Sequence, residues 1–263
     1  MTEIVDWLTT PHGRGAIDIA VRARQVSPDP LAVAACLQRE LDLPAPYRAA
    51  ATLQAELRSR LLARWGEAPE WLLTRDGIEQ ATHPSIRRWR SALMNSLGAT
   101  AVADLGCALG FESQSFADAG LRVRAVERDL ESAAIATMNL GGAHARVDIF
   151  DVVEDPEALA AVLEDVDAVF IDPARRNADA PRSVDGASGN RISSPRDWSP
   201  SWDFISELGE QQSRLVAKVA PGIDKEIIPA GAHTTWYAIR GQLAEASIWW
   251  PGWEIESKSR AIA

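Results

Sequence analysis

The most constraining feature of this sequence is a regular alternation of short apolar runs and helical segments between residues 101 and 172. The apolar runs are AVADLG, LRVRAVE, ARVDIF and DAVFID, and the segment DLESAAIATMNL between two of them has helical spacing and ends at Gly141. Strands that alternate with helices form parallel βαβ units with right-handed crossovers. A further strand is expected in SRLVAKVA. The sequence therefore predicts an α/β protein with a mostly parallel sheet.

The segment after this region has a different pattern. TTWYAIR and LAEASIWW are separated only by Gly241 and Gln242, which is too short for a crossover and suits an antiparallel hairpin. We therefore expect the parallel sheet to end in an antiparallel C-terminal hairpin.

The first third of the chain predicts helices. DPLAVAACLQRELDL begins with Asp29 as a helix N-cap and Pro30 at the first helical position, and the following segment repeats apolar residues at helical spacing up to Gly66. A third helix, PSIRRWRSALMNSL, leads into the first strand. We expect a small helical N-terminal domain over residues 1–82 and an α/β domain over residues 83–263.

Composition excludes several classes of function. The N-terminus lacks the pattern of a signal peptide, and no apolar run approaches the roughly 18 residues of a membrane span, so a cytoplasmic protein without a membrane partner is expected. The two cysteines and four histidines show no metal or redox spacing, so we expect no metal. A formal charge of −10 argues against binding of polyanions by the whole surface.

The first apolar run continues into a glycine turn, VADLGCALGFES, of the kind that holds a nucleotide cofactor. Ligands of open α/β sheets lie at the carboxyl ends of the strands, where Gly106 and Gly110 would let the backbone approach closely. Glu127 ends the next strand, where an acid can accept hydrogen bonds from both ribose hydroxyls. These features fit NAD as well as S-adenosylmethionine.

Three details favour S-adenosylmethionine. The spacing is Gly-x-x-x-Gly, which departs from the Gly-x-Gly-x-x-Gly pattern that admits a pyrophosphate. Asp104 places a carboxylate beside the turn, where it would repel a pyrophosphate and suit a cationic amino-acid group. The antiparallel hairpin is the third detail.

The motifs DLGCALG, VDIFD and DPARR, together with Glu127, resemble class I S-adenosylmethionine-dependent methyltransferases. WLLTRDGIEQATHPSIRRWR and EASIWW look like the bacterial THUMP-like-domain methyltransferases, in which a C-terminal THUMP-like domain usually follows the hairpin. This chain ends at SKSRAIA, so we expect either a short protein or a piece without that domain. The resemblance implies a Rossmann-like methyltransferase sheet with S-adenosylmethionine as cofactor.

The resemblance also implies roles for particular residues. Asp104, Gly106 and Gly110 would line the methionine end of the cofactor, Glu127 its ribose, and Asp148 with Ile149 its adenine edge. Gln80 and Thr82 would close over the methionine carboxylate. Each assignment has a structural alternative: a plain strand-to-helix turn for the glycines, a solvated strand-end acid for Asp148, and helix capping for Gln80 and Thr82.

The run FIDPARR should place Asp172 and the carbonyl of Pro173 beside the transferred methyl group. Asp172 could accept a hydrogen bond and then a proton from a target amine, or it could simply anchor a loop. Ala174 follows where amino-methylating nucleic-acid enzymes often have an aromatic residue, so the methylated atom does not follow from the motif.

The segment from Pro173 to Ser201 carries an excess of positive charge in an acidic protein. Its five arginines exceed its three aspartates by two, and Arg175 and Arg176 directly follow the motif. With Trp198 as a stacking face, this segment suggests an RNA substrate methylated on a base nitrogen. The alternatives are that the tryptophan fills the core, that the substrate is a small molecule or a protein, and that the chain is a cofactor-binding scaffold without transfer activity.

Overall fold

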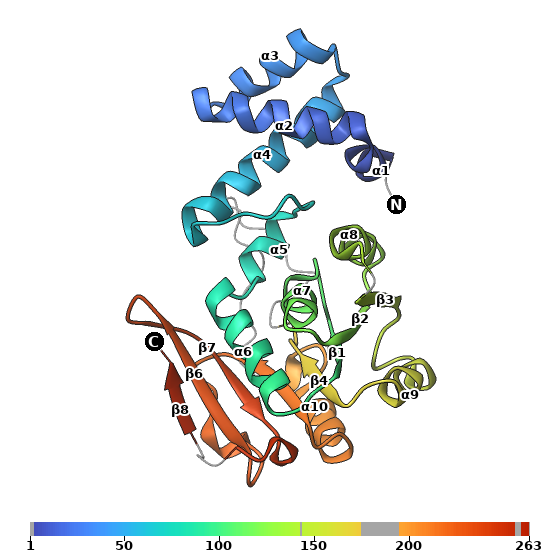
Figure 1. Ribbon diagram of the computed structural model, residues 1–263, viewed down its shortest axis with the longest axis vertical. Helices are drawn as coiled ribbons and strands as arrows, with labels where there is room; N and C mark the ends of the chain where they lie inside the picture. Colours follow the sequence, from blue (N-terminus) through green and yellow to red (C-terminus); the bar gives the residue numbers. More distant parts are fainter. Residues whose placement is uncertain (1–2, 143, 175–194, 256–258, 263) are drawn as a thin grey trace.

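A computed structural model of the protein describes residues 3–142, 144–174, 195–255 and 259–262. An eight-stranded mixed sheet runs through it in the order β3-β2-β1-β4-β5-β7-β6-β8 (Figure 1). The strands are β1 (Ala101–Leu105), β2 (Arg122–Glu127), β3 (Ala145–Ile149), β4 (Ala168–Ile171), β5 (Leu215–Val219), β6 (His233–Ile239), β7 (Gln242–Trp249) and β8 (Ser259–Ile262).

The first five strands are parallel, as the strand-helix alternation predicts. Strand β7 lies antiparallel between β5 and β6, so the expected C-terminal hairpin is confirmed. Its turn lies one residue earlier than expected, at Arg240 and Gly241, which both have positive φ angles (52° and 77°). Two positive φ angles match the right-handed twist of the flanking strands. The sequence analysis did not predict β8, which pairs in parallel with β6.

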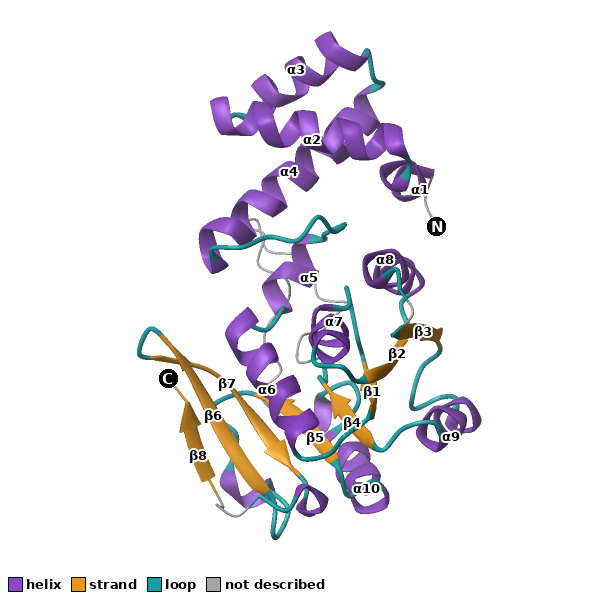
Figure 2. Cartoon of the chain, in the orientation of Figure 1, coloured by secondary structure: helices purple, strands orange, loops and turns teal. Residues whose placement is uncertain are grey.

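Helices cover both faces of the sheet (Figure 2). Alternation along β1 explains the two layers, because Ala103 and Leu105 face one hydrophobic core and Val102 faces the other. The first core includes side chains from α9 (Pro156–Glu164) and α10 (Trp202–Gln211). The second includes side chains from α6 (Pro84–Ser96), α7 (Phe111–Asp118) and α8 (Leu130–Leu140).

A helical unit precedes the sheet and lies at one end of the molecule (Figure 1). It consists of α1 (Glu3–Thr9), α2 (Pro11–Val26), α3 (Pro30–Leu41) and α4 (Ala45–Trp65). The expected cap of α3 is confirmed, since the Asp29 carboxylate accepts a 3.0 Å hydrogen bond from the Leu31 amide. Short helix α5 (Arg75–Gln80) connects this unit to α6.

Three short 3-10 helices complete the described elements: η1 (Pro195–Asp197), η2 (Lys225–Ile227) and η3 (Pro251–Trp253). The core of the helical unit continues into the sheet layers through Leu109, Phe111 and Ile135. The boundary at residue 82 therefore stays a prediction.

Candidate functional site

A cleft of about 1340 Å³ opens at the carboxyl ends of β1, β2 and β4. The glycine turn after β1 forms its floor, and Gly106 and Gly110 both have positive φ angles (86° and 89°). A Cβ atom on Gly110 would lie 3.0 Å from the Leu140 side chain, and one on Gly106 would lie 3.4 Å from the Asp172 carbonyl oxygen. The positive φ angles favour glycine at both positions, and close packing against Leu140 adds to this at Gly110.

Glu127 reaches from the end of β2 into this turn. Its Oε2 accepts a 2.9 Å hydrogen bond from the Ala108 amide, and its Oε1 accepts one of the same length from the Asp129 amide. An ionised carboxylate has about four lone-pair positions, so each oxygen can still accept a hydrogen bond from a ligand. The residue lies in the cleft, as its place after β2 predicts.

Asp104 lies deeper in the cleft and is almost completely buried, with 1% of its surface exposed. Its Oδ2 accepts a hydrogen bond from the Ser113 hydroxyl. Burial raises the pKa of Asp104 to about 7, helped by the negative charges of Glu112, Asp172 and Glu127 and opposed by the Ser113 hydrogen bond. A cation placed beside this carboxyl group would favour its ionised form.

The structure differs from the sequence expectation at the adenine edge. Asp148 does not line the cleft, because its carboxylate pairs with Arg124 (2.8 Å) and Arg146 (3.1 Å). Ile149 is exposed and also lies outside the cleft lining. The residues that line it are Phe150, Asp151 and Val152, which follow β3. Asp148 is the fourth residue of β3, and its carboxylate is held by the two arginines.

Gln80 lines the cleft from the end of α5, and Thr82 lines it from the connection between α5 and α6. The backbone oxygen of Thr82 accepts a hydrogen bond from Arg87, but its buried hydroxyl has no hydrogen-bond partner among the described residues. Glu112 Oε2, also in the cleft lining, is buried and lacks a partner in the same part of the chain. Buried polar atoms are normally satisfied, so both atoms suit contact with a ligand.

Asp172 and Pro173 lie at the end of β4 and line the cleft. Lys218 on β5 donates a 2.7 Å hydrogen bond to Asp172 Oδ2 and a 3.1 Å hydrogen bond to the Gln80 carbonyl oxygen. The sequence analysis missed this lysine, although a basic residue inside the apolar strand LVAKV is a signal that could have identified it.

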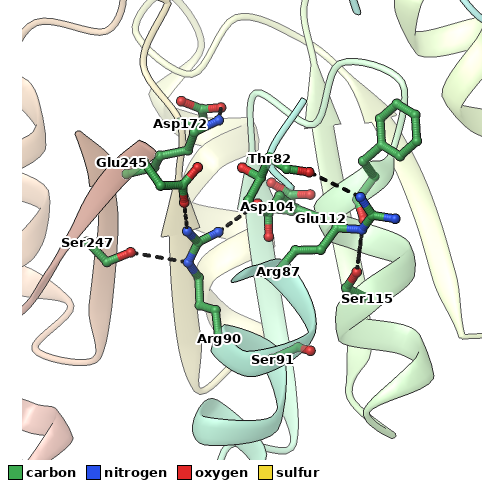
Figure 3. Close-up of polar contacts among 12 residues, drawn as sticks. Thr82, Arg87, Arg90, Ser91, Asp104, Glu112, Ser115, Asp172, Glu245 and Ser247 are labelled. Atoms are coloured by element: carbon green, nitrogen blue, oxygen red, sulfur yellow. Dashed lines mark hydrogen bonds and ion pairs between the residues drawn. The ribbon is translucent and has the colours of Figure 1, made fainter. Parts of the chain in front are cut away.

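The sequence analysis also missed a buried ion-pair network centred on Arg90. Figure 3 shows its guanidinium between the carboxylates of Glu112 and Glu245, with Ser247 accepting a further hydrogen bond. The guanidinium also lies 4.9 Å from the Phe170 ring centroid. The network joins α6, α7 and β7 below the cleft, and two of its acids line the cleft itself.

The predicted substrate-binding residues are only partly described. Arg175 and Arg176 lie outside the described residues. Trp198 is 6% exposed and packs edge-on against Trp202, so it belongs to the hydrophobic core, as the alternative interpretation predicted. Its indole face is not presented to the cleft in this arrangement.

No group of three or more His, Cys, Asp or Glu residues in the described part of the chain could hold a metal ion. A helix with the length and apolar character needed to cross the bilayer is likewise not found among the described residues.

We compared the chain with known proteins. No protein-family model matches the sequence, and no curated protein matches it significantly. The crystal structure of a "putative methyltransferase" from Porphyromonas gingivalis W83 matches 90% of this chain with a TM-score of 0.64 and 21% identity. This chain covers 58% of that protein, a little over half of its length.

Two further crystal structures share less of the fold. Cofactor-bound Rv0187 from MTB has a TM-score of 0.48 and 16% identity, with 86% of this chain and 99% of that chain covered. The "putative RNA methyltransferase PH1948" from Pyrococcus horikoshii has a TM-score of 0.38 and 20% identity, with 63% and 79% covered. The P. gingivalis match and the strand order together show that the chain has a Rossmann-like methyltransferase fold.

Proposed function

We propose that this protein is an S-adenosylmethionine-dependent methyltransferase. The observation that carries the proposal is the pairing of the buried Asp104 with Glu127 at one glycine turn, in a sheet of methyltransferase topology. In this proposal the turn at Gly106 and Gly110 holds the methionine end of the cofactor, and Glu127 accepts hydrogen bonds from its ribose.

The charges of the cleft support this cofactor over a dinucleotide. S-adenosylmethionine carries an ammonium and a sulfonium, and the acids that line the cleft include Asp104, Glu112, Asp172 and Glu245. A cation beside the buried Asp104 would favour its ionised form, whereas a pyrophosphate there would disfavour it. The unpartnered oxygens of Thr82 and Glu112 lie in the same lining and can accept hydrogen bonds from an ammonium.

For the adenine end we propose Asp151 and Val152, which line the cleft where Asp148 and Ile149 do not. Thr82 lines the cleft together with the acids Asp104 and Glu112. These acids favour contact of Thr82 with the ammonium of the cofactor's methionine part over the expected contact with its carboxylate.

The bound cofactor supplies an electrophilic methyl group on sulfur. Asp172 accepts a hydrogen bond from the N–H of the target and orients the nitrogen lone pair toward that methyl group. Asp172 then receives the proton as the lone pair forms the N–C bond and the S–C electron pair returns to sulfur. Positioning of this kind contributes up to about 7–11 kcal/mol to catalysis, and Pro173 helps to enclose the site.

We propose RNA, methylated on a base nitrogen, as the substrate. The arginine excess between residues 173 and 201 supports this choice, because arginine forks bind phosphates. The resemblance to THUMP-like-domain methyltransferases agrees with it. A small molecule or a protein as substrate, or a cofactor-binding scaffold, are the alternatives, and the scaffold is disfavoured by the paired Asp172 at the site of transfer.

Isothermal titration with S-adenosylmethionine, S-adenosylhomocysteine and NADH tests the cofactor. We expect the first two to bind a folded sample and NADH not to bind; the reverse result would refute the proposal. Transfer of labelled methyl groups to fractionated cellular RNA, protein and metabolites then identifies the substrate class, and label confined to protein or metabolites would exclude RNA.

A further inference from the structure

Lys218 is a buried cation beside Asp172 and Pro173, at the end of β4, which we call the candidate methyl-transfer corner. Only 4% of its surface is exposed, whereas a quarter of the Asp172 side chain is exposed toward the cleft. The lysine also lines the cleft but is far less exposed than Asp172, and it donates a hydrogen bond to Asp172 Oδ2, 2.7 Å away. The third element at this point is the end of α5, whose Gln80 carbonyl oxygen accepts the second hydrogen bond of the ammonium.

The charges around this pair are mostly negative. Glu245 from β7, Glu112 from α7 and Asp104 from β1 are all buried and line the same cleft, and the buried Arg90 from α6 pairs with the two glutamates. Burial alone disfavours the charged form of Lys218, but the negative charges of Asp172, Glu245 and Glu112 outweigh it and raise its pKa. Lys218 is thus charged and neutralises the partly exposed Asp172 carboxylate.

We propose that Lys218 determines which form of the target group the corner accepts: by pairing with Asp172 it makes that carboxylate a hydrogen-bond acceptor for a neutral N–H group and prevents it from holding an ammonium. This inference rests on the proposed function and specifies the substrate further. Lys218 acts through Asp172 and is a positioning residue.

The chemical reason lies in the lone pair of the nucleophile. A nitrogen held as an ammonium has no free lone pair and cannot attack the methyl carbon. An unpaired, partly buried carboxylate stabilises a neighbouring cation, so Asp172 without Lys218 would favour the protonated form of an amine. With Lys218 in place, the corner suits a neutral nitrogen, such as the exocyclic or ring nitrogen of a base, over an alkylammonium.

The test uses two ligands that differ only at the transfer position and needs no substrate. S-adenosylhomocysteine is uncharged there, whereas sinefungin carries an ammonium in place of the sulfonium methyl group. Isothermal titration at pH 7.5 would compare both ligands on the wild type, Lys218→Met, Asp172→Asn, the double variant, and Lys225→Met as a control at an exposed lysine beyond the same strand.

We expect changes of opposite sign in the preference for sinefungin over S-adenosylhomocysteine. Lys218→Met should raise it by about tenfold, because Asp172 loses its competing cation, and Asp172→Asn should lower it by about tenfold, because the Lys218 charge is left unpaired. The double variant, which keeps a neutral pair, should lie within about threefold of the wild type, and Lys225→Met should not change the preference.

The outcomes separate the two proposals. If a folded wild type binds neither ligand, the proposed function fails and this inference with it. If both ligands bind but Lys218→Met weakens the binding of both equally, or leaves the preference unchanged, the proposed function stands and the role of Lys218 is overturned. Damage to the fold would not by itself strengthen the binding of sinefungin relative to S-adenosylhomocysteine. A melting curve for each variant verifies folding.

Discussion

The Ser113 hydroxyl donates a 2.5 Å hydrogen bond to Asp104 Oδ2 across the glycine turn. The two residues come from α7 and β1, and both are almost fully buried. The bond holds the Asp104 carboxyl group in a fixed orientation at the cleft floor. Its surroundings raise the pKa of Asp104 from 3.8 to about 7, chiefly through burial.

This shift predicts that Asp104 makes stability depend on pH. The folded protein holds the Asp104 proton more tightly than the unfolded chain does. The stability that this bound proton contributes is therefore complete below about pH 4 and is lost as pH rises to about 7. The loss amounts to up to about 4 kcal/mol, at 1.36 kcal/mol per pKa unit. Asp104→Asn should therefore gain stability relative to the wild type between pH 4 and pH 8. Urea unfolding without ligand measures this, and a pH-independent difference would contradict it.

Glu127→Ala should weaken cofactor binding. Loss of hydrogen bonds to a charged acceptor costs roughly 1.5–3 kcal/mol, which raises the Kd about 10- to 150-fold. Because the carboxylate also accepts the Ala108 and Asp129 amides, Glu127→Gln is the matched variant that keeps an acceptor in the turn. Titration with S-adenosylhomocysteine measures the effect, and unchanged affinity in a folded Glu127→Ala variant would refute the ribose assignment.

Arg90→Met should be strongly destabilising, by roughly 3–5 kcal/mol, because Glu112 and Glu245 would remain buried without their cation. Arg88→Met is the control on the same helix. The Arg88 side chain is 60% exposed and that of its partner Glu67 is 41% exposed, so the loss should stay below about 1 kcal/mol. Denaturant unfolding of both variants gives the comparison; equal losses would mean that the buried network contributes no more than a surface pair.

Arg175 and Arg176 should contribute to RNA affinity through phosphates. Their joint replacement by alanine should weaken binding and lower the salt slope by about 0.7 for each lost phosphate contact, while cofactor affinity stays unchanged. Arg22→Ala with Arg39→Ala removes the same charge from exposed positions on α2 and α3. The measurement is the binding of labelled RNA at salt concentrations between about 50 and 200 mM. If the slope of affinity against salt is unchanged in the Arg175 and Arg176 variant, the phosphate role is ruled out.

Much of the fold followed from local patterns. The strand-helix alternation and the short hairpin spacing were sufficient for the sheet, because both depend on periodicity and loop length. Strand β8 escaped prediction because it pairs with β6, from which β7 separates it in the sequence, and such a pairing leaves no local signal.

The site followed less completely. The glycine turn, Glu127 and Asp172 were predictable, since each lies at the end of a strand or directly follows one. Lys218 carried one local signal, a basic residue inside an apolar strand, but its partner Asp172 lies 46 residues away in the sequence, and Arg90 pairs with Glu245, 155 residues away. The register at the adenine edge depended on where β3 ends, and strand boundaries are poorly encoded in a short apolar run.

The shared hydrophobic core of the helical unit has a consequence for cooperativity. Leu109 from the glycine turn, Phe111 at the start of α7 and Ile135 from α8 belong to the same hydrophobic cluster as residues of α2 and α4. Local opening of the helical unit would expose these side chains to water, so the turn and the N-terminal helices belong to one unfolding unit. Amide protons of the turn should then exchange with solvent at rates similar to those of α4. A ligand in the cleft should also slow the hydrogen exchange of amides in the N-terminal helices.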